Sequence, residues 1–365
     1  MWKTAEGSTG RLIQLCIGYF LFYVITGVTV KYYLGSADQG LPGMSGVEFL
    51  VYSTAGGSGL AVGVVLLLRW FRLESQNPVQ VGGITIPGEA LYIIPSGVCT
   101  AVVIPTTTLM YTLPIPVVVA MVLMRGSVIV ISRVVDSLQI RQGLLDKKVY
   151  WQENIAVVFA LSAVAVNVLV ARDGGFDFIT NRAAMTIFLS YIVAYAIRIY
   201  IMNYYKNTRP KGKPLNNKAF FGIEQIAASA TLILAAWAFY TFGAGVGLGG
   251  PVLDDFRGAI NQPLPDWPGA ILAGMAFGAV AFFSVFLFMF KGRTATFAGL
   301  VNRLTSLIAG TVATLIWHFG WGGRAPKTQD WVALGLIFIA IYFMSVAEKR
   351  RTAELKARRE IPVTA

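Results

Sequence analysis

Charged side chains are scarce in this sequence, and so are histidine and cysteine. Only 13% of the residues are charged, whereas 56% are hydrophobic, and the mean hydropathy is +0.64. A soluble domain carries about a quarter charged residues, so this chain has too few polar groups to cover a surface in water. One histidine and two cysteines provide neither a disulfide framework nor the ligand spacing of a zinc site.

The hydrophobic residues are gathered in long blocks. Many blocks exceed the ~20 apolar residues that a helix needs to cross a hydrocarbon core of about 30 Å. The strict alternation of polar and apolar residues that a membrane β-barrel needs is absent. We therefore predict an all-α integral membrane protein with ten transmembrane helices, at residues 11–33, 47–70, 89–112, 114–135, 152–172, 182–206, 219–243, 267–291, 295–317 and 330–348.

The basic residues are distributed unequally between the two sides of the predicted membrane. If alternate loops are assigned to opposite sides, 21 of the 30 Lys and Arg residues lie on the side that carries the N-terminus, six lie on the other side and three lie inside spans. Cytoplasmic loops carry such an excess, which predicts a multi-pass protein of the inner or plasma membrane with both termini in the cytoplasm. The basic tail at 349–365 is predicted to rest near anionic lipid headgroups, and the same distribution argues against a nucleic-acid partner.

The two halves of the chain resemble each other. Arg125 opens an apolar run and is followed by Trp151 after 26 residues, while Arg303 opens a similar run and is followed by Trp331 after 28 residues. Five predicted spans in each half force the second half to enter the membrane upside down. We predict a first five-helix repeat at 1–181 and a second, inverted five-helix repeat at 182–348. Transporters built from inverted repeats bind their substrate at the repeat interface, near the midplane of the membrane.

Arg125 and Arg303 are predicted to lie deep in the membrane. They are ten and eight residues from the cytoplasmic ends of their spans, which corresponds to about 15 and about 12 Å at ~1.5 Å per residue. Each arginine costs ~2.5–3.5 kcal/mol at the centre of a bilayer, and the sequence places no obvious carboxylate beside either. We interpret the pair as an anion-binding site, with Ser306 on the same side of the helix as Arg303.

Other polar residues inside the spans form a second set of candidates. Arg198 and Glu224 lie at similar depths on consecutive spans, and the sequence leaves open whether they form a structural ion pair or take part in substrate binding or proton coupling. Hydroxyl groups recur at helical spacing and either line a cavity or bond to backbone carbonyls. The substrate-binding residues predicted from these patterns are therefore Arg125, Arg303, Arg198, Glu224, Tyr191, Tyr195, Thr100, Thr107 and Ser306, with no catalytic residue, metal ligand or cofactor.

Glycines at four-residue spacing occur in two of the spans. The pairs are Gly59 with Gly63 and Gly274 with Gly278. Small residues at this spacing allow membrane helices to approach closely. We predict that both pairs lie at helix–helix contacts.

Two segments resemble a known transporter superfamily. Residues 121–171, from MVLMRGSVIVISR to the helix after Trp151, resemble the fourth and fifth helices of the solute-carrier family 35 proteins, especially the F-type subgroup. Residues 295–347 are similar to the ninth and tenth helices of nucleotide-sugar and triose-phosphate members of the same drug/metabolite transporter (EamA-like) superfamily. The resemblance implies ten helices in two inverted repeats, with basic residues on the fourth and ninth helices that hold the substrate phosphate. By position, Arg125 and Arg303 match that role. The resemblance also implies a substrate-binding role for Asn302, which beside Arg303 is similar to the Asn-and-basic pattern of the superfamily.

The sequence thus predicts an alternating-access transporter of a small anionic or phosphorylated metabolite, rather than an enzyme. An alternative within the same fold is a flippase that moves a lipid headgroup past the arginines. A membrane-embedded enzyme has only Glu224, Asp254 and Asp255 as candidate acids or bases, and a structural subunit would use the arginines to bind a partner helix. The expected partners are membrane lipid and the small-molecule substrate, and the sequence is also compatible with a homodimer.

Overall fold

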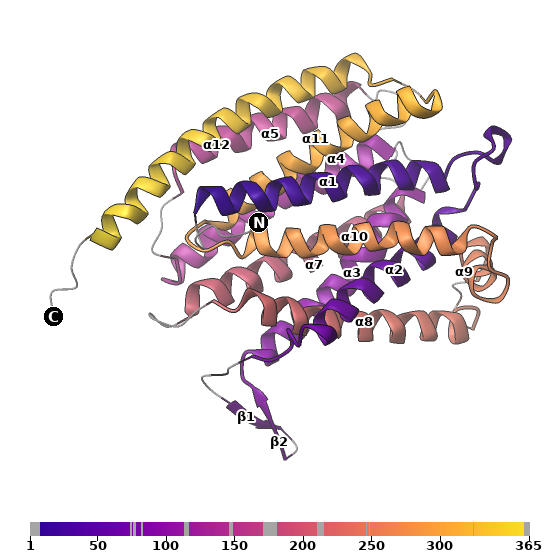
Figure 1. The fold of residues 1–365 in the computed structure, drawn as a ribbon, viewed down its shortest axis with the longest axis horizontal. Coiled ribbons are helices and arrows are strands. Elements are labelled where there is room, and N and C mark those ends of the chain that lie inside the picture. The colour runs from indigo at the N-terminus through magenta and orange to yellow at the C-terminus, as the bar shows by residue number, and fades with distance from the viewer. Residues whose placement is uncertain are drawn as a thin grey trace.

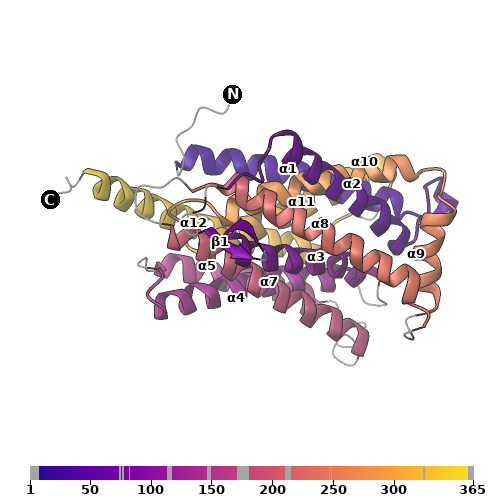
Figure 2. The same cartoon turned by 90° about the horizontal axis from the view of Figure 1, so that it is seen from below.

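A computed structural model shows a bundle of long helices that run side by side (Figures 1 and 2). The structure describes residues 8–73, 75, 78–81, 83–112, 117–145, 149–170, 181–209, 215–245, 247, 249–323 and 325–360. In chain order its elements are α1 (Thr9–Tyr33), the short 3₁₀ helix η1 (Ala37–Gln39), α2 (Gly46–Leu67), β1 (Pro78–Val81), β2 (Ile84–Pro87), α3 (Ala90–Thr112), α4 (Val117–Arg141), α5 (Trp151–Val170), α7 (Arg182–Thr208), α8 (Asn217–Phe242), α9 (Pro251–Asn261), α10 (Trp267–Phe288), α11 (Ala295–Trp321) and α12 (Thr328–Glu360).

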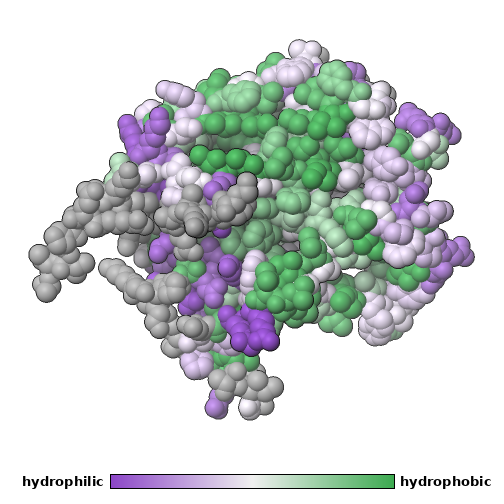
Figure 3. Space-filling view, viewed as in Figure 1, coloured by the Kyte–Doolittle hydropathy of each residue, from purple (hydrophilic) through white to green (hydrophobic). Residues whose placement is uncertain are grey.

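The surface of the bundle is suited to lipid. Figure 3 shows a broad hydrophobic face in the middle of the molecule, with hydrophilic residues gathered at its two ends. In the part of the chain that the structure describes, eight helices are long and apolar enough to cross a membrane, namely α1, α2, α3, α7, α8, α10, α11 and α12. These observations agree with an all-α, membrane-embedded protein. The crossing of α4 and α5, and with it the ten-span inverted repeat, stays a prediction.

Helices from the two predicted halves of the chain pack on each other. Helix α1 lies against α10 and α11, α2 lies against α10, α3 lies against α8 and α7, and α5 lies against α12. Helix α4 contacts α7, α11 and α5. The predicted boundary at residue 181 falls just before α7, and residues 171–180 lie outside the described part of the chain. Residues on α1, α4, α7 and α11 can therefore meet in the interior of one bundle.

The contact between α2 and α10 depends on glycine. A Cβ atom at Gly274 would collide with the Ser53 backbone, and one at Gly278 would collide with Gly57 of α2. The prediction of close packing was right for this pair. It was wrong for Gly59 and Gly63, because a Cβ at either position would meet no atom of a neighbouring helix within 4 Å in the part of the chain that the structure describes. The spacing of two glycines identifies a helix face, but it does not tell which face is turned toward a neighbour.

A β-hairpin and the short helix α9 lie in segments that the sequence predicted as loops. Strands β1 and β2 pair antiparallel with Val81 opposite Ile84, and Gly83 adopts a positive φ of 84° at their turn. Helix α9 begins with Pro251 and buries Leu253 to 1% exposure, at the end of the bundle opposite the hairpin (Figure 1). Both are short surface elements, and the search for apolar blocks of membrane length could not find them.

Two helices continue farthest past their predicted ends. Helix α4 continues past the predicted end at residue 135 to Arg141. Helix α12 continues to Glu360, so the described part of the basic tail is helical and extends beyond the rest of the bundle (Figure 1).

Candidate functional site

Arg125 and Arg303 are both buried in the helix bundle. Their exposed fractions are 6% and 7%, and they come from the adjacent helices α4 and α11. The Arg125 Nη2 donates a hydrogen bond to the Tyr23 hydroxyl at 3.2 Å, and its guanidinium carbon lies 5.5 Å from the centre of that ring. The charges of both arginines act on the Tyr23 hydroxyl. The structure therefore buries both predicted anion-binding residues on neighbouring helices, within electrostatic range of one tyrosine.

Four tyrosines surround these guanidinium groups. Tyr19 and Tyr23 on α1 have ring centres 5.4 Å apart, and Tyr191 and Tyr195 on α7 have ring centres 4.9 Å apart. The Arg303 guanidinium lies 5.1 Å from the centre of the Tyr195 ring, and all four tyrosines act electrostatically on it. We call these four residues the tyrosine cage. Each pair has the spacing i, i+4, which places both rings on one side of its helix.

The hydrogen-bonding groups of Arg303 are only partly satisfied. Its Nε and Nη2 atoms are buried and have no hydrogen-bond partner among the residues that the structure describes. A buried donor without a partner costs about 1–3 kcal/mol. The stacking on Tyr195 compensates for part of this cost, because a cation over an aromatic ring gains about 0.5–2 kcal/mol. A ligand with oxygen acceptors would satisfy the remaining donors.

Arg198 and Glu224 form a buried ion pair one turn of α7 away from Tyr195. The Arg198 Nε and Nη2 donate to the two Glu224 carboxylate oxygens at 2.9 and 3.1 Å. The same carboxylate accepts hydrogen bonds from Ser96 at 2.7 Å and Thr100 at 3.2 Å. Both carboxylate oxygens are thus occupied by the protein. Of the two readings that the sequence left open, these contacts favour the structural ion pair.

The remaining predicted residues are held by other protein groups. The Thr107 hydroxyl donates to the Val103 carbonyl at 2.7 Å, and the Ser306 hydroxyl donates to the Arg303 carbonyl at 2.8 Å. Asn302 accepts a hydrogen bond from the Tyr19 hydroxyl at 3.3 Å and donates one to Ser284 at 3.0 Å. Asn302 therefore holds the Tyr19 hydroxyl of the tyrosine cage by a hydrogen bond. The hydroxyl groups of Thr107 and Ser306 instead donate to carbonyl groups of their own helices.

Sequence reasoning missed Tyr19 and Tyr23. The signal was present, because residues 19–23 read YFLFY and residues 191–195 read YIVAY, with two tyrosines four residues apart in each case. The two motifs lie on the first predicted span of each half. A comparison of the halves beyond their arginines and tryptophans would have found them.

A second polar cluster ties the helices together at the end of the bundle that holds the start of α1. Asp136 on α4 accepts hydrogen bonds from the backbone N–H groups of Ala295 and Thr296 at 2.8 and 2.6 Å. It therefore satisfies the free N–H groups at the N-terminus of α11 and places a negative charge at the positive end of that helix. The Thr294 hydroxyl donates to Glu153 on α5 at 3.1 Å.

The same cluster continues into α12. Arg293 donates two hydrogen bonds to the Glu348 carboxylate, one of them at 2.6 Å from Nε. Arg351 lies 3.8 Å from the Glu153 carboxylate, and the Thr9 hydroxyl of α1 donates to Glu348 at 3.1 Å. We call Asp136, Glu153, Arg293, Thr294, Glu348 and Arg351 the end network; all six are at most 7% exposed. The network joins α1, α4 and α5 to α11 and α12.

No family model matches the sequence, and no curated protein matches it. A solved structure that is described only as "Crystal structure of protein" matches with a TM-score of 0.55 at 12% sequence identity, and the match covers 94% of this chain and 99% of that chain. The likeness shows a shared fold over nearly the whole chain. Fold and site together define a membrane-embedded helix bundle with a buried cluster of arginines and tyrosines.

Proposed function

We propose that this protein is a membrane transporter that moves a small anion, with a phosphate or carboxylate group, by alternating access. The observation that carries the proposal is Arg303, whose buried guanidinium leaves Nε and Nη2 without hydrogen-bond partners among the described residues. A guanidinium offers paired donors that match the oxygens of a phosphate or carboxylate. Arg125, which donates a hydrogen bond to Tyr23 and lies on the neighbouring helix α4, supplies the second positive charge.

The electrostatics of the interior support an anionic substrate. Two positive charges that share one aromatic neighbour repel each other, and this repulsion is screened less inside the protein than in water. The carboxylate of Glu224 is committed to Arg198 and does not neutralise them. An anion bound between Arg125 and Arg303 would remove both the repulsion and the unsatisfied donors. In the proposed ten-span architecture the arginines lie on the fourth and ninth spans, one in each inverted half, as expected for a site at the repeat interface.

The end network supplies the contacts that would have to break when the proposed site opens. In this structure Arg125 and Arg303 are almost completely shielded, and the network links α4 and α5 to α11 and α12 at one end of the bundle. In the proposed topology this end is cytoplasmic. Release of substrate to the cytoplasm would then require Asp136 to separate from the N-terminus of α11, while the other end of the bundle closes.

Ligand-dependent unfolding of the purified protein tests the proposal. The probes are inorganic phosphate, phosphorylated sugars, dicarboxylates and nucleotide-sugars. A ligand that binds only the folded state stabilises it by about 2.7 kcal/mol at a concentration of 100 times Kd. We expect an anion to stabilise the wild type and to have no effect on the stability of Arg125→Gln or Arg303→Gln. The control variant Lys291→Gln, which changes an exposed basic residue, should be stabilised by the anion as much as the wild type.

Transport in liposomes completes this test. The same anion should be exchanged by the wild type and by Lys291→Gln, and not by the two arginine variants. Suppose that an anion stabilises both arginine variants as much as the wild type and that both variants transport it equally well. The proposed binding site is then wrong. If only uncharged or cationic compounds bind, the anionic substrate class is wrong.

A groove on the lipid-facing side favours lipid translocation as a second candidate. It has a volume of about 450 Å³ and is lined by residues of α3 and α7, among them Cys99, Val102, Leu189, Val193 and Ile197. Leu189 and Val193 are 51% and 57% exposed, so the groove is apolar and open to lipid. It runs along the helix that carries Tyr191 and Tyr195. Movement of a fluorescent phospholipid between leaflets by the purified protein, abolished in Arg303→Gln, would support this candidate over solute exchange.

A further inference from the structure

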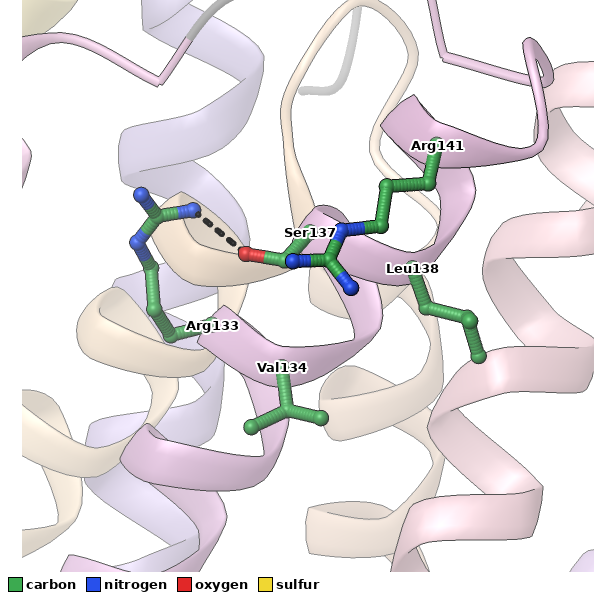
Figure 4. Close-up of a pocket in the computed structure, with 5 residues that line it drawn as sticks. All are labelled: Arg133, Val134, Ser137, Leu138 and Arg141. Carbon is green, nitrogen blue, oxygen red and sulfur yellow. Dashed lines mark hydrogen bonds between the residues drawn. The ribbon is translucent and has the colours of Figure 1, made fainter.

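A small cavity lies on the outward face of α4, away from the arginine site. It has a volume of about 260 Å³ and is lined by Arg133, Val134, Ser137, Leu138 and Arg141 (Figure 4). All five residues come from one helix, and no residue of the tyrosine cage contributes. The cavity is therefore a feature of the protein surface and is separate from the proposed transport site.

Two arginines converge on this cavity from opposite directions. Arg133 extends along α4 toward Ser137 and donates a hydrogen bond to its hydroxyl at 3.2 Å, while Arg141 extends back from the end of the helix to the same level (Figure 4). Helical side chains normally tilt toward the N-terminus. Arg133 instead reaches toward the C-terminal end of α4, as basic side chains do when they carry their charge from the hydrocarbon to the headgroup layer.

Two positive charges line the cavity. Neither Arg133 nor Arg141 forms an ion pair with any residue in the described ranges. The nearest carboxylate along the helix, Asp136, is turned inward and binds the start of α11. Two like charges beside one hydroxyl group thus favour an anion that accepts hydrogen bonds from all three side chains.

The surroundings of the cavity are apolar. Val130, Val134 and Leu138 are 45%, 59% and 44% exposed, and their spacing of four residues makes them a stripe along α4. This stripe leads directly to the two arginines. A ligand that fits both parts has an anionic head and long hydrocarbon tails.

We propose that this face of α4 is a specific binding site for an anionic phospholipid. Arg133, Ser137 and Arg141 would hold the phosphate, and the acyl chains would lie on the stripe of Val130, Val134 and Leu138. The basic end of α4 lies on the predicted cytoplasmic side, so the lipid belongs to the inner leaflet. The site depends on the membrane location of the protein and not on its transport function.

Native mass spectrometry of the full-length protein in mild detergent tests this site. The probes are phosphatidylglycerol and phosphatidylcholine with identical acyl chains. A basic residue near an anionic membrane contributes about 1 kcal/mol, so the double variant Arg133→Gln/Arg141→Gln should bind phosphatidylglycerol on the order of 10- to 30-fold more weakly. Binding of phosphatidylcholine should not change.

A matched control removes two exposed basic residues elsewhere on the predicted cytoplasmic side, as Arg72→Gln/Lys291→Gln. We expect this control to bind phosphatidylglycerol like the wild type, and Ser137→Ala to show an intermediate loss. Arg141 is exposed, so Arg141→Gln alone provides a variant that should fold normally and lose several-fold affinity.

Three outcomes would overturn the proposal. The first is wild-type affinity for phosphatidylglycerol in Arg133→Gln/Arg141→Gln. The second is an equal loss in Arg72→Gln/Lys291→Gln, because binding would then follow net charge alone. The third is complete displacement of phosphatidylglycerol by millimolar inorganic phosphate, because the occupant would then be a soluble anion. None of these results bears on Arg125 or Arg303, so the transport proposal is tested separately.

Discussion

Two of the buried arginines, Arg198 and Arg303, should respond in opposite ways to the same substitution. Both are close to fully buried, with exposed fractions of 4% and 7%, and both lie near the ring of Tyr195. Arg198 is paired with Glu224 through two hydrogen bonds, whereas Arg303 has two donors without partners in the described structure. Replacement of each by Met keeps a long, flexible side chain and removes the charge.

The expected changes in the free energy of unfolding follow from the contacts that each substitution removes and the groups that it leaves unpaired. Arg303→Met removes two unsatisfied donors, at about 1–3 kcal/mol each, and loses a cation–π contact of about 0.5–2 kcal/mol. We expect a net stabilisation of about 2 kcal/mol. Arg198→Met leaves the Glu224 carboxylate buried without its cation, and the loss of one partner from a buried pair costs ~3–5 kcal/mol. Ser96 and Thr100 still donate to Glu224, so the lower end of this range applies.

The assay is the unfolding midpoint of both variants and the wild type, in one detergent, at one scan rate and without ligand. Arg303→Met should unfold a few degrees above the wild type and Arg198→Met several degrees below it, because a change of 1 kcal/mol shifts the midpoint by about 2–4 °C in domains of 150–250 residues and by less in larger ones. Arg303→Met should also lose its response to anions.

The two substitutions are predicted to change the stability in opposite directions, so one measurement distinguishes the two roles. If Arg303→Met is destabilised as much as Arg198→Met, then Arg303 is part of the structural framework and was not retained for a ligand. The double variant Arg198→Met/Glu224→Leu serves as a further control. It should be close to the wild type in stability, because replacement of a whole buried ion pair by apolar residues is often neutral or stabilising.

Three more predictions concern other parts of the molecule. Gly274→Ala should destabilise the protein by about 1–3 kcal/mol through its contact with α2, whereas Gly63→Ala faces open space and should be neutral or slightly stabilising in the same unfolding assay. Asp136→Asn should weaken the end network by about 1–2 kcal/mol. It should also increase labelling of a cysteine placed at Ser306 by a membrane-impermeant maleimide added on the predicted cytoplasmic side, in a protein without its native cysteines. Unchanged labelling would show that the network does not control access. Tyr23→Phe removes the hydrogen bond to Arg125, at a cost of about 1 kcal/mol, and should weaken anion binding several-fold in the ligand-dependent unfolding assay without loss of the folded state.

The helices of this protein were largely predictable, because lipid imposes a simple rule on the sequence. A backbone in hydrocarbon must satisfy its own hydrogen bonds, so each long apolar block becomes a helix. A helix was found in each of the ten predicted ranges. The hairpin at Pro78–Pro87 and the short helix α9 were not predicted, because they lie in loops, where this rule does not apply.

The site was predictable in its charges and less so in its contacts. The cost of burying a cation singled out Arg125, Arg198 and Arg303 from the sequence alone. Which of them has a carboxylate partner depends on how α7 and α8 are rotated and how deeply each lies, and the structure assigns Glu224 to Arg198. Tyr19 was missed because a tyrosine in a span is not costly, and its importance comes only from the residues around it.

The sequence by itself determined that this protein is embedded in lipid and which positions carry its rare buried charges. Both conclusions follow from the free energy of transfer of each residue into hydrocarbon. Only the tertiary structure decided which charges meet. The rotation of α1 and α7 turned two tyrosine pairs toward the arginines, and the contact of α4 with α11 brought Arg125 and Arg303 to the same cage. These choices depend on side-chain packing between helices far apart in the chain, such as Gly57 against Gly278, and packing of this kind leaves no local pattern in the sequence.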